Sequence, residues 1–438
     1  MPSLKMLFHR NGKKNLTAPS NELVILRQVI PWQGIITRLV PFYKRRKGRR
    51  GKSLRMMVAV VILSRLRHLS DEGVIQAIRE NRYMQYFCNV PDKGLATFLN
   101  PSTLCRFRKR LGTKGMAVLE DVVFEQLRQA GVIQGDALLM DSSVLESNII
   151  YPNDVRLLYT AFGKMYQFAH RQHLPTWWDQ DHLKKRWRAF NLSKQAERNA
   201  YLIEFYALFM PALDVFRTSV RALAMPKKTR QHAANLLSVL SMLETQTQQK
   251  LAGEQHIANR LVSLDELDAR PIKKGKAHPS CEFGTTIQMT FNRQGFLITT
   301  ENFIGQPNDK TLYSGTLQLF TARMERAPDH VVTDLGFRSR QNFKDTPETI
   351  GSVFLGRSDD VEAEQRDFCR SARSATEGFI AVAKHLRGFG RSLYRGLQGD
   401  RIWTLACQTA YNLKKLVQLY RQERLTEESL VKLGLLAG

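Results

Sequence analysis

The chain has 438 residues, 43% of them hydrophobic, which is enough for two or three packed domains. Its 66 Lys and Arg residues outnumber 40 Asp and Glu residues, and the formal net charge of +26 favours a nucleic acid as partner, although charge alone also suits a membrane surface or an acidic protein. No membrane span is expected, because the longest apolar run, residues 56–63, is far shorter than the roughly 20 residues a spanning helix needs. Five scattered cysteines without C-x-x-C spacing argue against a disulfide framework or structural zinc and fit a reducing cytoplasm.

The first 131 residues predict a basic, all-helical domain. Helices are expected from 54 to about 69, after the basic run at 44–52, then from Ser70, and then from Asn100 to Gly112. The last of these helices carries the cations Arg106, Arg108, Lys109 and Arg110. A short basic helix that ends a helical domain is typical of a DNA reader whose last helix enters the major groove, and a solvated helix face is the alternative.

The next segments predict a buried strand followed by a helical insertion. After one more helix over 115–130, four apolar residues run into Asp141, as in a buried strand whose end carries a carboxylate. Residues 155–260 are again helical and rich in Trp, Arg and Lys. We expect the Trp side chains to pack within the insertion, and stacking on DNA bases is the alternative.

Strand patterns resume after the insertion. Alternating apolar residues around a polar turn predict a hairpin over 283–303. Short strands are expected at 331–334 and 351–356, and two helices at 362–386 and 401–421. The chain therefore reads as an α/β domain with a mixed sheet flanked by helices.

Three acidic residues stand at ordered points of this α/β pattern: Asp141 and Asp334 at strand ends and Glu377 on a helix. This order resembles that of RNase H-like nucleases, in which the acids meet beside a mixed sheet. Three converging carboxylates suit two Mg²⁺ ions, with Mn²⁺ as a substitute, because these cations prefer hard oxygen ligands. Three other acids, which stand at neither a strand end nor the required helix position, are interpreted as structural: Asp136, Asp154 and Asp309.

A basic pattern surrounds the third acidic residue. Arg373, Glu377 and Lys384 are four and seven residues apart, so they share one face of the expected helix. That face would present a metal-binding carboxylate flanked by two cations that grip phosphates, and an ordinary surface ion pair beside a lone Lys is the alternative. Beyond it, Arg387 and Arg391 belong to a basic, glycine-rich loop suited to a DNA backbone.

At these residues the chain resembles a known family. Segments 138–154, 331–337 and 373–384 are similar to insertion-sequence DDE transposases whose third acidic residue lies in a Y-x₂-R-x₃-E-x₆-K signature. One position departs from it, because Arg370 stands where the signature has Tyr.

The resemblance implies an RNase H-like DDE catalytic domain over 132–154 and 261–438, with the helical insertion at 155–260 inside it. Residues 1–131 would then be the helical DNA-binding and dimerisation domain. It also implies binding to terminal inverted repeats and target DNA, synapsis as a homodimer, strand cleavage and strand transfer, with no membrane partner. A bacterial cytoplasm, at the nucleoid, is the expected location.

Two rival functions remain open on the sequence. One is a non-catalytic DNA-binding protein derived from a transposase. The other is a nuclease of the same fold that cuts structured DNA without joining strands. Metal-dependent cutting separates the first rival from a transposase, and cutting of branched substrates that lack inverted-repeat ends identifies the second.

Overall fold

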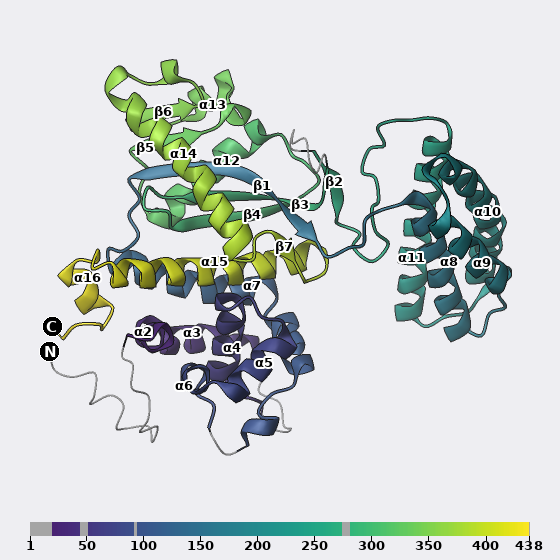
Figure 1. The fold of residues 1–438 in the computed structure, drawn as a ribbon, viewed down its shortest axis with the longest axis horizontal. Helices are drawn as coiled ribbons and strands as arrows, with labels where there is room; N and C mark the ends of the chain where they lie inside the picture. Colours follow the sequence, from purple (N-terminus) through teal and green to yellow (C-terminus); the bar gives the residue numbers. More distant parts are fainter. Residues whose placement is uncertain (1–19, 44–50, 92–93, 274–280, 438) are drawn as a thin grey trace. The chain divides into compact units, whose positions relative to one another are not determined.

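The structure is a computed structural model that describes residues 20–43, 51–91, 94–273 and 281–437 (Figure 1). Most of the basic run expected at 44–52 lies outside the described residues. The chain divides into two compact units, and each is described by itself. The first comprises residues 1–146, 286–303 and 307–438, and the second residues 147–285 and 304–306.

The first unit begins with helices α2 (Glu22–Val29), α3 (Trp32–Leu39), α4 (Leu54–Leu66), α5 (Asp71–Glu80), α6 (Arg82–Cys88) and α7 (Pro101–Gln129). The expected start of α5 is confirmed, because the Ser70 side chain accepts a hydrogen bond from the Gly73 backbone N–H. The expected break at Gly112 is also confirmed: its φ of 58° and ψ of −166° interrupt the helical geometry within α7. Helix α4 is buried over almost its whole length, so it forms the centre of these helices.

The strands are β1 (Ala137–Ser147), β2 (Arg270–Ile272), β3 (Glu282–Phe291), β4 (Leu297–Ile304), β5 (His330–Thr333), β6 (Ser352–Leu355) and β7 (Arg391–Ser392). In the first unit, β1 lies between β3 and β5, and β6 follows β5 at the edge. The pairs β1–β5 and β5–β6 are parallel, whereas β3 and β4 form the expected antiparallel hairpin. The sheet is therefore mixed, as the sequence patterns predict.

The remaining helices of the first unit are α12 (Asp309–Met324), α13 (Arg340–Asp345), α14 (Ala363–Leu386), α15 (Gly396–Arg421) and α16 (Glu427–Lys432). Figure 1 shows α14 crossing one face of the sheet. Successive strand residues face two different cores: Leu138 packs with the core that contains α12, and Leu139 packs with the core that contains α14. Full burial of a side chain of this size stabilises the fold by about 1.5–3 kcal/mol relative to leaving it exposed.

The second unit contains the expected helical insertion: α8 (Asp154–Arg171), α9 (Gln180–Leu192), α10 (Arg198–Ala222) and α11 (Lys227–Leu251), drawn in teal in Figure 1. It has its own hydrophobic core, which includes the fully buried Phe205, Phe209 and Phe216. Trp187 stacks on Tyr159 with ring centroids 4.7 Å apart. This packing agrees with the expectation that Trp side chains support the insertion itself.

Among the described residues, no single helix has the length and apolar composition of a membrane span. One pair of helical segments, Glu22–Val29 and Trp32–Phe42, meets that test only when taken together across a 58° bend.

Candidate active site

The register of the parallel strands places two of the predicted acids side by side. Leu138 pairs with Val331 and Leu139 with Val332, so paired residues are 193 positions apart in the chain. Asp141 and Asp334 are separated by the same 193 positions. Asp141 lies two residues after Leu139, and Asp334 lies two residues after Val332. They therefore lie at the same level, where parallel sheets collect ligands. Asp334 follows the end of β5 as expected, but the strand-end prediction is wrong for Asp141, because β1 continues past it to Ser147.

Strand alternation turns both of these acids toward α14. Leu139 and Val332 belong to the core that contains α14. Because side chains two residues apart in a strand share a face, Asp141 and Asp334 face the same way. The His330 ring, on the same face of β5, packs against Phe368 of α14 with centroids 4.7 Å apart. The third predicted acid, Glu377, lies on this helix.

The guanidinium of Arg373 lies between the three carboxylates. Its Nη1 atom is 3.6 Å from Asp141 Oδ2, and its Nη2 atom is 3.3 Å from Glu377 Oε1 and 4.0 Å from Asp334 Oδ2. The side-chain exposure is 15% for Asp141, 34% for Asp334 and 69% for Glu377, so the site opens toward solvent on the Glu377 side. The structure thus brings Asp141, Asp334 and Glu377 around one cation.

Backbone amides donate to the other oxygens of the two aspartates. The N–H of Ser142 donates to Asp141 Oδ1 at 2.7 Å, and the N–H of Gly336 donates to Asp334 Oδ1 at 2.9 Å. Gly356, after β6, packs against this second turn: with its φ of +90°, an added Cβ would lie 2.6 Å from the Leu335 nitrogen. A side chain at that position would push the Asp334 turn away.

The donor set fits a divalent cation in its chemistry. Carboxylate oxygens are the ligands Mg²⁺ prefers, and these three come from three separate elements. Arg373 now lies between them, and among the described residues no three His, Cys, Asp or Glu side chains stand ready to hold a metal ion. Arg373 Nη1 is buried and has no hydrogen-bond partner, so the arginine is held there by loose ion pairs that a divalent cation can replace.

The three predicted cations that follow Glu377 in the chain, Lys384, Arg387 and Arg391, lie in different environments. Lys384 lies in the last turn of α14 and is half-buried. Arg387 follows that helix, and burial lowers the pKa of its guanidinium. Arg391, expected in a free basic loop, is instead part of β7, which pairs with β1, and its Nη2 atom lies 2.6 Å from Glu146 Oε2. The loop prediction is therefore corrected at this residue.

The four predicted cations on α7 do not share one environment. Arg106, Lys109 and Arg110 are exposed, whereas Arg108 is buried and makes two hydrogen bonds to Asp71, at 2.8 and 2.6 Å. Burial opposes the charge on Arg108, but the hydrogen bonds with Asp71 raise the pKa of its guanidinium above the ordinary value. In this structure Arg108 joins α7 to α5, and the other three side chains are exposed.

Asp309, which the sequence patterns indicate to be structural, lies beside the neighbour of Asp141. Asp309 opens α12, and its Oδ1 atom accepts a hydrogen bond from the Ser142 hydroxyl at 2.7 Å. Ser142 is the neighbour of Asp141 on β1, and it faces the opposite side of the sheet by strand alternation. Strand alternation predicts that Ser142 points to the opposite face from Asp141. Its partner there could be found only by knowing that a helix starts at Asp309.

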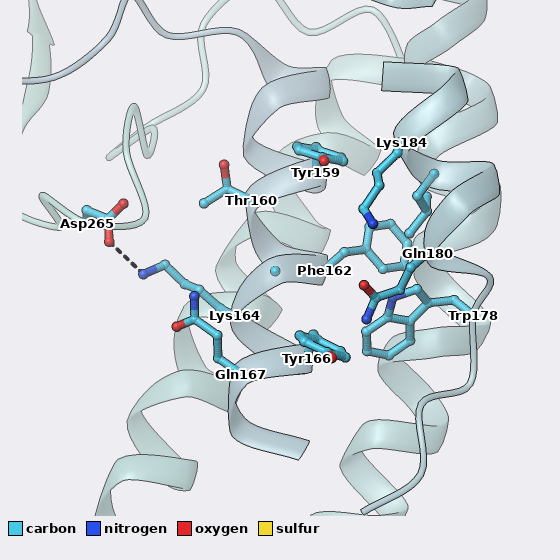
Figure 2. A pocket seen from close by; sticks show the side chains of 12 residues that line it. Tyr159, Thr160, Phe162, Lys164, Tyr166, Gln167, Trp178, Gln180, Lys184 and Asp265 are labelled. Atoms are coloured by element: carbon cyan, nitrogen blue, oxygen red, sulfur yellow. Dashed lines mark hydrogen bonds and ion pairs between the residues drawn. The ribbon is translucent and has the colours of Figure 1, made fainter. Parts of the chain in front are cut away.

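A separate cavity of about 290 Å³ lies in the second unit, between α8 and α9 (Figure 2). Tyr159, Phe162 and Trp178 line it, and Lys164 on its rim pairs with Asp265 at 2.7 Å. Phe162 contacts Trp178 edge-on, with centroids 5.4 Å apart. Trp178 thus serves the packing of the insertion and also borders an open space.

Comparison with known proteins adds three findings. A family model described as Transposase domain (DUF772) matches residues 11–110, which include α2 to α6 and the start of α7. An uncharacterised protein of Rhizobium meliloti, ORF8 in the nfe locus, is 32% identical over 154 residues, which cover 34% of this chain and 74% of that protein. No solved structure matches the chain.

Proposed function

Since the chain belongs to a family of transposase-domain proteins, we propose that it is a DNA transposase that cuts and joins DNA at Asp141, Asp334 and Glu377. The observation that carries this proposal is the convergence of the three carboxylates on Arg373, from β1, from the turn after β5 and from α14. An RNase H-like DDE arrangement of the sheet accounts for that convergence. A non-catalytic descendant would be under no physical constraint to keep three acids at one point.

The proposed cofactor is a pair of Mg²⁺ ions, for which Mn²⁺ can substitute. Asp141 would contact both ions, and Asp334 and Glu377 would each hold one. Such ions activate an attacking water or 3′-hydroxyl and stabilise the leaving oxygen. The oxygens that face Arg373 are the ones we assign to this role, and backbone amides orient the two aspartates by donating to Oδ1 of Asp141 and Oδ1 of Asp334.

The chain's own cations would position the DNA. Arg373 is joined to the acids by long contacts, so it can turn toward a phosphate beside the reacting bond. Lys384, Arg387 and Arg391 would contact the backbone further from the cut, and Arg106, Lys109 and Arg110 would do so on α7. Arg108 supports α7 through Asp71. Such phosphate contacts position the protein without reading sequence.

The proposed substrate is double-stranded DNA carrying the terminal inverted repeats of an insertion sequence, together with target DNA. The net charge of +26 supports a polyanionic substrate. The active assembly would be a homodimer that holds two element ends, at the bacterial nucleoid.

The test is cleavage of a labelled duplex taken from the ends of the element that encodes the chain, in Mg²⁺, Mn²⁺ or EDTA. Nicking at the element end should require metal and be lost in Asp141→Asn, Asp334→Asn and Glu377→Gln, while end binding is retained. Asp329→Asn is the matched control, because Asp329 is an exposed acid of the same unit that pairs with Arg326.

Three results would contradict the proposal. Tight end binding without cutting in any metal indicates a non-catalytic DNA-binding protein. Equal cutting of branched substrates that lack inverted repeats indicates a structure-selective nuclease. Full cleavage by one acid variant removes that residue from the site.

A further inference from the structure

Asp309 approaches the three acids from the far side of the sheet. It is the first residue of α12, after the N-cap Asn308, and its Oδ1 atom accepts a hydrogen bond from the Ser142 hydroxyl at 2.7 Å. Ser142 is only 8% exposed, so this bond is shielded from water. Its position in the sequence, at no strand end, gives Asp309 no obvious role.

One chain of hydrogen bonds links Asp309 to Asp141. Ser142 donates its hydroxyl to Asp309 and its backbone N–H to Asp141 Oδ1, the latter at 2.7 Å. A single strand residue therefore connects a carboxylate on the α12 face with a carboxylate on the α14 face. Loss of the first bond removes one of the contacts that hold Ser142, whose backbone N–H orients Asp141.

Asp309 also lies near Asp334, across Gly336. A Cβ added to Gly336 would lie 3.0 Å from Asp309 Oδ2 and also 3.0 Å from Asp334 Oδ1. The two carboxylate oxygens are therefore no further apart than twice that distance, with only a glycine between them. The negative charge of Asp309 repels the Asp334 carboxylate and so favours its position toward Arg373.

We propose that Asp309 is a positioning residue of the acidic site, which fixes Asp141 through Ser142 and orients Asp334 across Gly336. The inference rests on the proposed function, because it assigns Asp309 to the same metal-binding carboxylates. Groups that orient metal-binding side chains through hydrogen bonds typically change metal affinity or activity by about 10–100-fold when they are removed. Asp309 acts on the site without joining the three acids around Arg373.

The experiment measures Mn²⁺ affinity of the full chain by calorimetry, without DNA. Asp309→Ala and Ser142→Ala should each weaken Mn²⁺ binding by about tenfold. The double variant should be no weaker than Asp309→Ala, because Ser142→Ala removes only a hydrogen bond that Asp309→Ala removes as well. Asp309→Asn keeps an oxygen that accepts the Ser142 hydroxyl but loses the negative charge, so it should restore the part of the affinity that Ser142→Ala loses.

The chain offers a matched control pair in the same unit. Ser314 of α12 donates its hydroxyl to Asp345 of α13 at 3.0 Å, the same kind of contact as Ser142 to Asp309. Ser314→Ala and Asp345→Ala should leave Mn²⁺ affinity unchanged. Thermal unfolding of every variant without metal shows whether the fold is retained, and Ser142→Ala is the mildest of the changes.

The outcomes separate this inference from the proposed function. Unchanged Mn²⁺ affinity in Asp309→Ala and Ser142→Ala, with affinity lost in Asp141→Asn, overturns the role of Asp309 alone. Additive losses in the double variant, or no rescue by Asp309→Asn, also overturn it. A wild-type chain that binds no Mn²⁺, or an Asp141→Asn variant that binds it normally, overturns the proposed function as well.

Discussion

Arg373 Nη1 lies 3.6 Å from Asp141 Oδ2, and this buried nitrogen has no hydrogen-bond partner. The same guanidinium reaches Asp334 and Glu377. One arginine of α14 thus neutralises part of the charge that three acids bring to the edge of the sheet. Because its contacts are long, Arg373 competes with a metal ion only weakly for these oxygens.

The first prediction concerns this competition. Arg373→Ala should raise DNA-free Mn²⁺ affinity severalfold, because a partly exposed ion pair of this kind contributes up to about 1 kcal/mol. Cleavage should nevertheless fall, since the phosphate loses a cation. Calorimetry and the duplex cleavage assay measure the two effects, with Arg326→Ala, on an exposed pair with Asp329, as the control. Unchanged or weaker Mn²⁺ binding in Arg373→Ala would contradict the competition.

The second prediction concerns the space at Gly336. Gly336→Ala places a methyl group 3.0 Å from the carboxylates of both Asp309 and Asp334. We expect metal-dependent cleavage to fall by about 10–100-fold as the two acids are forced apart. Gly315→Ala is the control: Gly315 lies in α12 with open space around its Cβ position, so alanine there should stabilise the helix by about 0.5–1 kcal/mol and leave cleavage intact. Equal cleavage by the two variants would rule out the crowding.

The third prediction separates the basic residues of α7 by their environment. Arg108→Ala leaves the Asp71 carboxylate, whose side chain is 18% exposed, without its partner. The free energy of unfolding should fall by roughly 3 kcal/mol, which would be measured as a lower midpoint of thermal unfolding. Arg106→Ala, at an exposed position, should leave the midpoint unchanged. It should make the slope of log binding constant against log salt concentration shallower by about one, because one phosphate contact is lost. The assignment fails if Arg106→Ala destabilises the fold as much as Arg108→Ala.

Most of the secondary structure around the site follows from sequence patterns. The apolar runs before Asp141 and Asp334, the hairpin and the helix with Glu377 all lie where they were expected. Their spacing also indicated that Arg373 and Glu377 share a helix face, and the structure pairs them. Whether these residues catalyse a reaction stays a prediction.

Helix α12 was not predicted, and neither was the hydrogen bond between Asp309 at its start and Ser142. The buried face of α12 includes Thr316, while Leu319 on the other side is 42% exposed, so the apolar periodicity is blurred. The pairing of β7 with β1 was missed for another reason. Strand partners distant in sequence, such as Gly390 and Glu146, leave no local pattern.

The fourth prediction concerns pH. Glu120 of α7 is 1% exposed, and burial raises its pKa to about 7 although its partner Arg323 of α12 opposes the shift. The folded chain therefore binds this proton more tightly than the unfolded chain, whose carboxyl has a pKa near 4.5. The stabilisation that Glu120 contributes is fully present below pH 4.5 and is lost as the pH rises toward 7. Its size is roughly 1.4 kcal/mol for each unit by which the folded pKa exceeds the unfolded one.

Glu120→Gln tests the pH effect, because the amide does not titrate. The thermal midpoint of the variant, relative to that of the wild-type chain, should rise between pH 5 and pH 8. The control is Glu325→Gln, which changes a largely exposed acid in the same unit that pairs with Arg128. Parallel pH profiles for the wild-type chain and Glu120→Gln would contradict the raised pKa.

The pairing of β1 with β5 has a consequence for protein synthesis. Leu138 leaves the ribosome 193 residues before its partner Val331, and the helical insertion, which has its own core, is completed between them. Contacts so distant in sequence close late and slowly. Glu377 is made later still, so the nascent chain completes helices α2 to α7 long before the three acids can meet at one point. A ribosome that stalls before α14 would release a chain that has those helices and lacks the third carboxylate.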